Sequence, residues 1–327
     1  MKKLLICKIL LLLVSFAIFS TGKKESQQKT ENNKLTVFVS ILPQKYFLEK
    51  IGGDRLDVKV MVPPGKSPHN YEPTPDQVMA LGASKMFFTI DVPFENSFLP
   101  KIKSNLKNMV FIDTAKGIKK RHLESHSHEE EEHDEHEEDE KHDEDDKHDE
   151  DEEHDDHDDD HDHEEGADDP HTWMSPVLVK KQADNIYQAL TAHDPEYQSQ
   201  YKNGYNSLIQ ELDQVHTELE NILRPLKGKT FFVYHPAFGY LTDEFGIRQV
   251  AIETGGNEPD PASLKEIIEH AQEEDVKVIF VQPEFSRSSA EIIAKAINGA
   301  VVSISPLNPD YINNLKLIAS EIKKALQ

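Results

Sequence analysis

Apolar residues fall along the chain in two alternating patterns, short continuous runs and longer amphipathic stretches. Runs of about four to eight apolar residues bounded by turn residues are typical of buried strands, whereas apolar residues spaced about three or four apart indicate helices. The segment 43–53, for example, has a proline at its start and glycines at its end, which are common boundary signals of a helix. From residue 35 onward the two patterns predict strand and helix in turn.

This alternation occurs in two blocks. The first block predicts strands at 35–42, 56–62, 85–90 and 108–113, with helices at 43–53, 75–84 and 92–104. The second block predicts strands at 229–235, 247–253, 276–282 and 300–306, with helices at 236–246, 261–275, 288–299 and 311–326. Strand followed by helix, repeated in this way, is typical of a mostly parallel sheet with helices on both faces.

A long stretch between the blocks, 176–226, is helical throughout, and Pro195 is its one expected break. We therefore predict an α/β fold with two lobes, 34–175 and 227–327, each with a roughly four-stranded, mostly parallel sheet flanked by helices. The long helical linker of 176–226 joins the lobes and leaves a cleft between them. Because ligands of open α/β sheets bind outside the carboxyl ends of the strands, residues that follow strands are the candidates for a site in the inter-lobe cleft.

The amino terminus has the pattern of an export signal. Residues 1–22 contain two early lysines, a long apolar run and small residues, and a polar tether, 23–33, follows. The sequence FSTGKK at 19–24 resembles a lipoprotein signal in which threonine replaces the anchoring cysteine, and an uncleaved anchor is the alternative. The single cysteine, Cys7, lies inside the signal, so the mature chain has no disulfide or cysteine metal site. We expect a periplasmic or otherwise extracytoplasmic protein.

Charge is concentrated in one segment of the first lobe. The formal net charge is -25, yet residues 122–165 alone contain 28 Asp and Glu, 2 Lys and 11 His. Outside this segment 33 acidic residues face 34 basic ones, so the rest of the protein is near neutral. The segment cannot bury enough apolar surface to offset the entropy of ordering, so we predict a disordered insert. Neither part has the clustered basic residues that nucleic acid requires.

Histidines dispersed among carboxylates give this insert many weak metal sites. Imidazole and carboxylate ligands must be deprotonated to bind, so capture weakens as the histidines protonate near pH 6.5. We interpret the insert as an accessory that captures metal for another site. Two alternatives are a solvated acidic linker and a metal-buffering or adhesive surface protein that works through the insert alone.

Three histidines outside the insert lie just beyond an element end. His69 occurs in PPGKSPHNYEPTP, His171 in DPHTWMSP and His235 in KTFFVYH. Neutral imidazole is a preferred zinc donor, and three such donors leave one coordination position open. The sequence therefore favours a shared metal site over three separate structural histidines. The remaining histidines lie on predicted amphipathic helices and are expected at the surface: His193, His216 and His270.

The motifs PPGKSPHNYEPTP, DPHTWMSP, VYHPAFGYL, GGNEPDPASL and FVQPEF follow one another over nearly the whole mature chain. Together they resemble the zinc-binding solute receptors of bacterial ABC transporters, within a cluster that also contains manganese receptors. The resemblance implies that His69, His171 and His235 bind Zn²⁺ as a transported ligand. It also implies a monomeric, non-enzymatic protein that delivers the ion to an ABC permease. Zinc members of the family place an acidic, histidine-rich loop just before the DPH motif, where this chain has its insert.

The fourth ligand is left open by the resemblance. The aspartate of manganese receptors aligns near Ser286, which cannot replace it, and this favours zinc because manganese prefers oxygen-rich coordination. Glu284 could be a direct ligand, a group beside a ligand or an outward-facing residue, with water in the fourth position otherwise.

Two rival functions use the same histidines. One is a manganese or iron receptor of the same cluster. The other is a zinc hydrolase, because three histidines and a water also form a catalytic geometry, with Glu284 as the one candidate base. The chain has no HExxH motif to supply a paired base, and no glycine-rich phosphate loop for a nucleotide.

Overall fold

The computed structural model describes residues 34–123, 167–254 and 256–327 of the 327-residue chain. The predicted export signal and tether lie outside the described residues, as does the insert except for its first two residues. No helix among the described residues has both the length and the apolar character needed to cross a bilayer.

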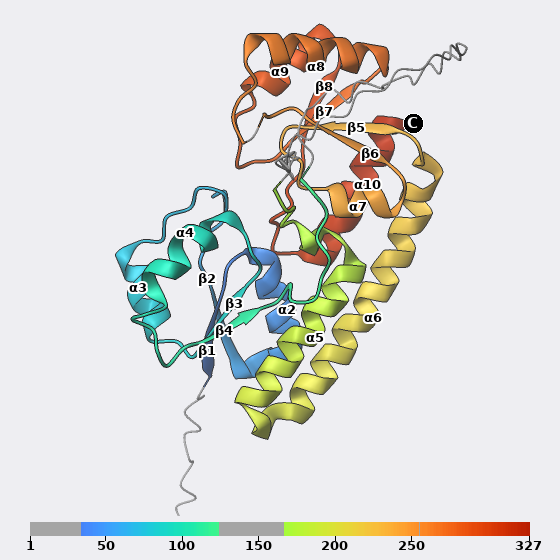
Figure 1. Cartoon of the computed structure of the whole chain (residues 1–327). Coiled ribbons are helices and arrows are strands. Elements are labelled where there is room, and N and C mark those ends of the chain that lie inside the picture. Colours follow the sequence, from blue (N-terminus) through green and yellow to red (C-terminus); the bar gives the residue numbers. More distant parts are fainter. Residues whose placement is uncertain (1–33, 124–166, 255) are drawn as a thin grey trace, which may run out of the picture. The chain divides into compact units, whose positions relative to one another are not determined.

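Two four-stranded sheets, both entirely parallel, form the framework (Figure 1). The first has the order β2-β1-β3-β4 and contains β1 (Leu35–Val39), β2 (Leu56–Val60), β3 (Met86–Thr89) and β4 (Val110–Asp113). The second has the order β6-β5-β7-β8 and contains β5 (Thr230–Val233), β6 (Arg248–Ala251), β7 (Val278–Val281) and β8 (Ala300–Ser303). The two sheets therefore repeat one topology, and the predicted fold class is confirmed.

Helices cover both faces of each sheet (Figure 1). The first sheet has α2 (Leu42–Gly52) on one face and α3 (Pro75–Gly82) and α4 (Pro93–Ile102) on the other. The second sheet has α8 (Pro261–Glu273) and α9 (Ser288–Ala296) on one face, with α7 (Gly239–Glu244) and α10 (Tyr311–Leu326) toward the other. A capping side chain precedes two of these helices, α3 and α8, and accepts hydrogen bonds from N–H groups of the first turn. Thr74 accepts from the N–H of Gln77, and Asp260 accepts from Ala262 and Ser263.

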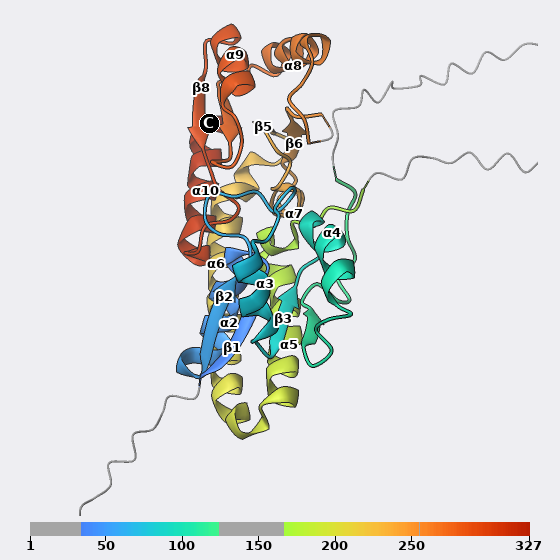
Figure 2. The same cartoon turned by 90° about the vertical axis from the view of Figure 1, so that its left-hand side faces the viewer.

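The predicted helical linker consists of two helices, α5 (Pro176–His193) and α6 (Gln198–Leu223), which lie side by side (Figures 1 and 2). The chain turns between them through a short 3₁₀ helix, Pro195–Tyr197, where the sequence predicted the break. Asp194 fixes this turn, because it pairs with Arg55 at 2.7 Å and accepts from the Tyr201 hydroxyl at 2.6 Å. Since α6 packs on both α2 and α10, one helix contacts both halves of the molecule.

The hydrophobic core continues from one half into the other. One cluster joins the first sheet, α5 and α6 to the inner face of the second sheet, where Phe231 and Val233 are fully buried. The next residue along the strand, Phe232, faces the opposite side and packs in a second cluster with α8 and α9. This alternation is the two-residue period of a strand covered on both faces.

Candidate metal centre

His69 lies in the loop between β2 and α3. Its backbone N–H donates to the Ser67 hydroxyl at 3.2 Å, and the carbonyl oxygen of Pro68 accepts from the N–H of Phe94 at 3.0 Å. The first turn of α4 is therefore hydrogen-bonded to the loop next to His69. Gly65 gives the loop a residue at φ 75°, a conformation that glycine adopts without steric cost.

Glu95, in the first turn of α4, anchors the start of this helix. It is 2% exposed, and its carboxylate accepts from the N–H groups of Ile90 and Asp91 and from the hydroxyl of Ser40. These partners follow β3 and β1, so Glu95 ties together the carboxyl ends of neighbouring strands. Burial raises the pKa of Glu95 to about 7, although its hydrogen bonds act in the opposite direction.

His171 is held by Asp169, two residues earlier. The carboxylate oxygen Oδ1 of Asp169 accepts from the His171 backbone N–H at 2.9 Å and lies 2.7 Å from its ring nitrogen Nδ1. Both residues are buried. The Asp-Pro-His sequence therefore makes a tight turn in which the acidic side chain fixes both the backbone and the ring of the histidine.

His235 follows β5 and is held in a similar way by residues far along the chain. Glu253, which follows β6, places Oε1 2.7 Å from Nδ1 of His235. Gln282, which follows β7, accepts from the His235 N–H at 3.2 Å and donates to its carbonyl oxygen at 2.6 Å. The ring of Phe285 stacks on the imidazole, with centroids 4.9 Å apart. Three segments of the second sheet thus fix one side chain.

The three histidines converge. Their ligand atoms all lie within 4.8 Å of one another, and among the described residues they form the one group of this kind. The Nε2 atoms of His171 and His235 are 3.2 Å apart. The ring centroids of His69 and His235 are 4.4 Å apart. Two nitrogens bound to one tetrahedral zinc ion lie about 3.3 Å apart, given zinc–nitrogen bonds of about 2.0–2.1 Å. The geometry therefore suits a single ion of this size.

The hydrogen bonds decide which ring nitrogens are free. An ionised carboxylate can only accept, so Asp169 and Glu253 require a proton on the Nδ1 atoms of His171 and His235. In the neutral rings both Nε2 atoms then carry lone pairs, and these face each other across 3.2 Å. Two opposed lone pairs repel each other unless a cation lies between them. A carboxylate behind the ring in this way fixes the tautomer and orientation of metal-binding histidines in proteins.

Burial favours the unprotonated forms of His69 and His235. Burial, together with the neighbouring His235 and His171, lowers the pKa of His69 to about 3. Burial also lowers the pKa of His235, and its effect exceeds that of the hydrogen bond that the ring donates to Glu253, which raises the pKa. For Asp169, burial opposes ionisation, but His171 and Arg121 together hold the pKa of this carboxyl below its usual value. His69 and His235 can thus receive a cation without first losing protons.

A small cavity of about 10 Å³ lies against the three histidines, and Glu284 and Trp173 also line it. Glu284 does not belong to the close group of ligand atoms in the described residues. It also lines an adjoining outer cavity of about 210 Å³, so it stands between the two spaces. Burial raises the pKa of Glu284. Trp173 is fully buried, packs beside His171 and donates to the carbonyl oxygen of Pro306 at 2.9 Å.

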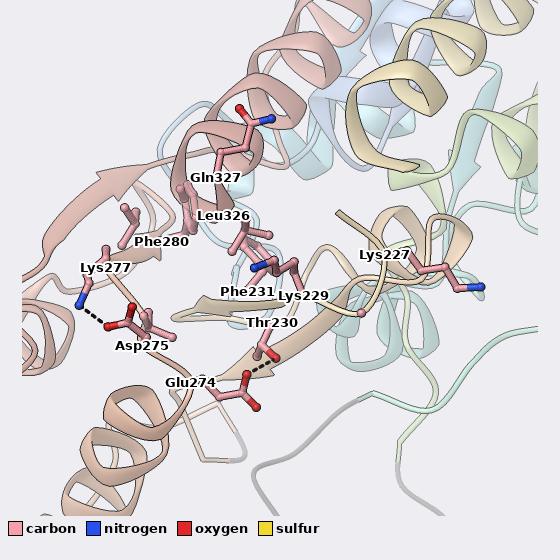
Figure 3. A pocket seen from close by; sticks show the side chains of 14 residues that line it. Lys227, Lys229, Thr230, Phe231, Glu274, Asp275, Lys277, Phe280, Leu326 and Gln327 are labelled. Carbon is pink, nitrogen blue, oxygen red and sulfur yellow. Dashed lines mark hydrogen bonds and ion pairs between the residues drawn. The ribbon is translucent and has the colours of Figure 1, made fainter. Parts of the chain in front are cut away.

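A larger cavity, about 540 Å³, lies at the other end of the second sheet, near the end of α10 (Figure 3). Lysines and acidic residues line it together, and none of the three clustered histidines does. Lys277 pairs with Asp275, and the Thr230 hydroxyl donates a hydrogen bond to Glu274 (Figure 3). It therefore offers no convergent metal ligands.

The helical histidines lie away from this group. His193 is exposed at the end of α5, and His216 is partly exposed and lies 3.2 Å from Glu244. The ring of His270 packs on Phe232, with centroids 5.1 Å apart. None of the three contributes to the cluster of ligand atoms found in the described residues.

Sequence reasoning missed three residues that orient the ligands: Asp169, Glu253 and Gln282. Glu253 and Gln282 each follow a strand, so the rule that sites form at strand ends would have selected them. Asp169 belongs to the quoted DPH motif, where an acidic residue two positions before a histidine commonly closes a turn.

Residues 37–325 match the family model described as zinc-uptake complex component A, periplasmic. The chain belongs to this family. The high-affinity zinc uptake system protein ZnuA of Bacillus subtilis (strain 168) is 28% identical over 300 residues, which cover 90% of this chain and 85% of that protein.

Two solved structures extend the likeness to the fold. A crystal structure of ZnuA is 34% identical, with a TM-score of 0.76 over 90% of this chain and 100% of that one. A crystal structure of a ZnuA deletion mutant with zinc bound is also 34% identical, with a TM-score of 0.75 over 90% of this chain and 98% of that one. As a member of the zinc-uptake family, the chain is a zinc-binding receptor of a transport system, and zinc is its transported ligand. The predicted family resemblance is confirmed.

Proposed function

We propose that this protein is an extracytoplasmic receptor that binds one Zn²⁺ through His69, His171 and His235 and delivers it to an ABC permease. The observation that carries the proposal is the pair of Nε2 atoms of His171 and His235, which face each other at 3.2 Å. Carboxylates behind both rings leave these nitrogens as lone-pair donors. The ring of His69 completes a three-nitrogen set.

The donor set favours zinc over manganese. The close group contains three imidazoles and no carboxylate oxygen among the described residues, whereas manganese prefers oxygen ligands. Three protein ligands leave one coordination position open in the cavity that Glu284 also lines. An arriving cation would favour the ionised form of Glu284, which burial otherwise disfavours. We assign Glu284 to this neighbourhood rather than to the primary ligand set.

Delivery to a permease and a periplasmic or otherwise extracytoplasmic location rest on the family. Its description names a periplasmic component of a zinc-uptake complex, and the Bacillus subtilis relative is named for high-affinity zinc uptake. A component that binds the ion outside the cytoplasm must pass it to a membrane partner. We propose that it does so as a monomer.

The acidic, histidine-rich insert has an accessory role in this proposal. Its ends are close together, because the N–H of Leu123 donates to the carbonyl oxygen of Ala167 at 2.8 Å and His122 forms a bridge with Asp168. Removing 124–166 and joining the ends with Asn-Gly, a common two-residue hairpin turn, therefore spares both this pairing and the three histidines.

The test is a calorimetric zinc titration with a competing chelator on the mature chain, the insert-deleted chain and single alanine variants of the three histidines. Each histidine variant should weaken the tight site by at least about 100-fold. This estimate assumes that about three or four ligands share an apparent binding free energy of about 10–16 kcal/mol. The deletion should leave the tight site intact and remove only weaker binding.

His193→Ala is the matched control, because this histidine is exposed at a helix end. Tight binding that survived replacement of all three clustered histidines would overturn the ligand assignment. Tight binding that vanished with the insert would make the insert the receptor site.

A further inference from the structure

Arg121 reaches from the last residues before the insert to a helix of the other half. Its side chain is 19% exposed, and its Nε atom lies 2.9 Å from the Asp243 carboxylate on α7. Its guanidinium also lies 5.9 Å from the centre of the Tyr240 ring. The Tyr240 hydroxyl accepts from the Arg121 N–H at 3.1 Å and donates to the Asp169 carbonyl oxygen at 2.8 Å. One turn of α7 therefore contacts both the backbone and the side chain of Arg121.

The same helix leaves space for the guanidinium at Gly239. A Cβ atom at this position would lie 1.4 Å from Nη1 of Arg121. Gly239 has none of the positive φ values that favour glycine, so its backbone conformation would accept alanine. The Arg121 guanidinium in its present position therefore leaves no space for a side chain at 239, which accounts for the glycine there.

The far end of Arg121 meets the carboxylate that holds His171. Nη1 of Arg121 lies 3.3 Å from Oδ2 of Asp169, while Oδ1 of the same carboxylate contacts the backbone N–H and ring Nδ1 of His171. The two oxygens thus serve different partners. The N–H of Asp169 also donates to the Arg121 carbonyl oxygen at 2.8 Å, so the two residues are joined at main chain and side chain.

We propose that Arg121, held by α7, is a positioning residue that fixes the Asp169 carboxylate and thereby aims the His171 ring at His235. This inference rests on the proposed zinc site. The carboxylate behind His235 is arranged differently, because Oε2 of Glu253 is buried without a hydrogen-bond partner in the described part of the chain. The arginine contact is therefore specific to the His171 side of the site.

Two variants remove the contact by independent routes. Arg121→Gln deletes the guanidinium, and Gly239→Ala displaces it while keeping the charge. We expect each to weaken zinc binding by about 10- to 100-fold, the usual effect of losing a group that orients a metal ligand. Arg121→Lys should recover part of the affinity, since it restores the charge but not the planar fork. In the Arg121→Gln background, Gly239→Ala should have no further effect.

Nuclear magnetic resonance of ¹⁵N-labelled imidazoles supplies a readout that a general loss of stability would not give. In both variants the Nδ1–H signal of His171 should lose the shift caused by its bond to Asp169, while that of His235 stays unchanged. Arg55→Gln is the control, because it breaks a similarly buried ion pair with Asp194 away from the metal ligands. It should lower the urea midpoint and leave the zinc dissociation constant unchanged.

Wild-type affinity in both Arg121→Gln and Gly239→Ala, with the histidine variants impaired, would overturn this inference alone. Wild-type affinity in the histidine variants would instead overturn the proposed function.

Discussion

At the scale of single residues, the candidate site is asymmetric. His171 and His235 each have a carboxylate behind Nδ1, whereas the backbone of His69 is held by its own loop and by the start of α4. A carboxylate partner fixes the tautomer and raises the basicity of a ligand imidazole. We therefore expect His171 and His235 to form the rigid part of the site and His69 to complete it.

Replacing Glu253 tests the contribution of such a partner. In Glu253→Gln the neutral amide accepts more weakly from Nδ1, and it can also donate there, which would place the ring proton on Nε2 and block metal binding. We expect zinc affinity to fall by about 10- to 100-fold with little change in secondary structure. Chelator-competition calorimetry and circular dichroism measure the two quantities.

Glu274→Gln serves as the control for that variant, since Glu274 contacts Thr230 and Arg248 at the opposite end of the same sheet. Equal zinc affinity in both variants would show that Glu253 does not act on the site.

At the scale of elements, the position of α6 decides how the halves are joined. Gly204 of α6 lies against the backbone of α2, where a Cβ atom would meet the carbonyl oxygens of Lys50 and Ile51 at 2.4 and 2.5 Å. Backbone atoms cannot move aside as the end of a flexible side chain can. The absence of a side chain at 204 thus sets the distance between the two helices.

Gly204→Ala should therefore destabilise the protein by about 1–3 kcal/mol, the usual cost of overpacking. Gly82→Ala is the matched change, because its Cβ would lie at an ordinary 3.5 Å from Leu106 at the end of α3. This second variant should be neutral or stabilising by up to about 1 kcal/mol, since alanine reduces the freedom of the unfolded chain. Urea unfolding measures both. Equal midpoints would contradict the role assigned to Gly204.

At the scale of the whole molecule, one hydrophobic cluster passes from the first sheet through α5 and α6 into the second. A continuous core of this kind resists independent motion of the halves, so we expect metal capture and release to involve local changes at the site. The buried histidines then affect the stability of the entire fold.

Burial of His69 should lower the stability of the metal-free protein as the solution becomes acidic, whereas the pKa of Glu95, raised to about 7, acts in the opposite direction because the folded state then binds a proton more readily than the unfolded chain. The pKa of His69 is about 3 in the folded state and 6.5 in its ordinary state, so the unfolded chain binds more protons between these values. The stability that depends on neutral His69 is fully retained above pH 6.5 and is lost as the pH falls toward about 3. Because Glu95 is unchanged in His69→Ala, the difference in urea midpoint between the insert-deleted chain and its His69→Ala variant, followed between about pH 7.5 and 5, isolates this loss.

Relative to the parent chain, the midpoint of His69→Ala should rise as the pH falls, whereas that of His193→Ala, at an exposed position, should follow the parent chain. An identical pH dependence of the urea midpoint in the two variants would show that burial of His69 does not affect stability in acid.

The sequence alone determined the elements, the two repeated α/β halves and the three clustered histidines. Strands and helices have side-chain periods of about two and 3.6 residues. The spacing of apolar residues along a short segment therefore indicates which side chains face the core. Parallel sheets follow from strand–helix alternation. His69, His171 and His235 could be selected because each stands just beyond an element end in a turn with a recognisable motif.

The tertiary structure decided which side chains stand behind the ligands. Glu253 lies 18 positions from His235 and Gln282 lies 47, and their contacts depend on the order of strands within the sheet. Tertiary packing likewise made the linker a helix pair and left Glu284 outside the close group. It also brought Arg121 onto Gly239, a contact across 118 positions. Such pairings leave no local pattern, because they arise only when distant segments pack together.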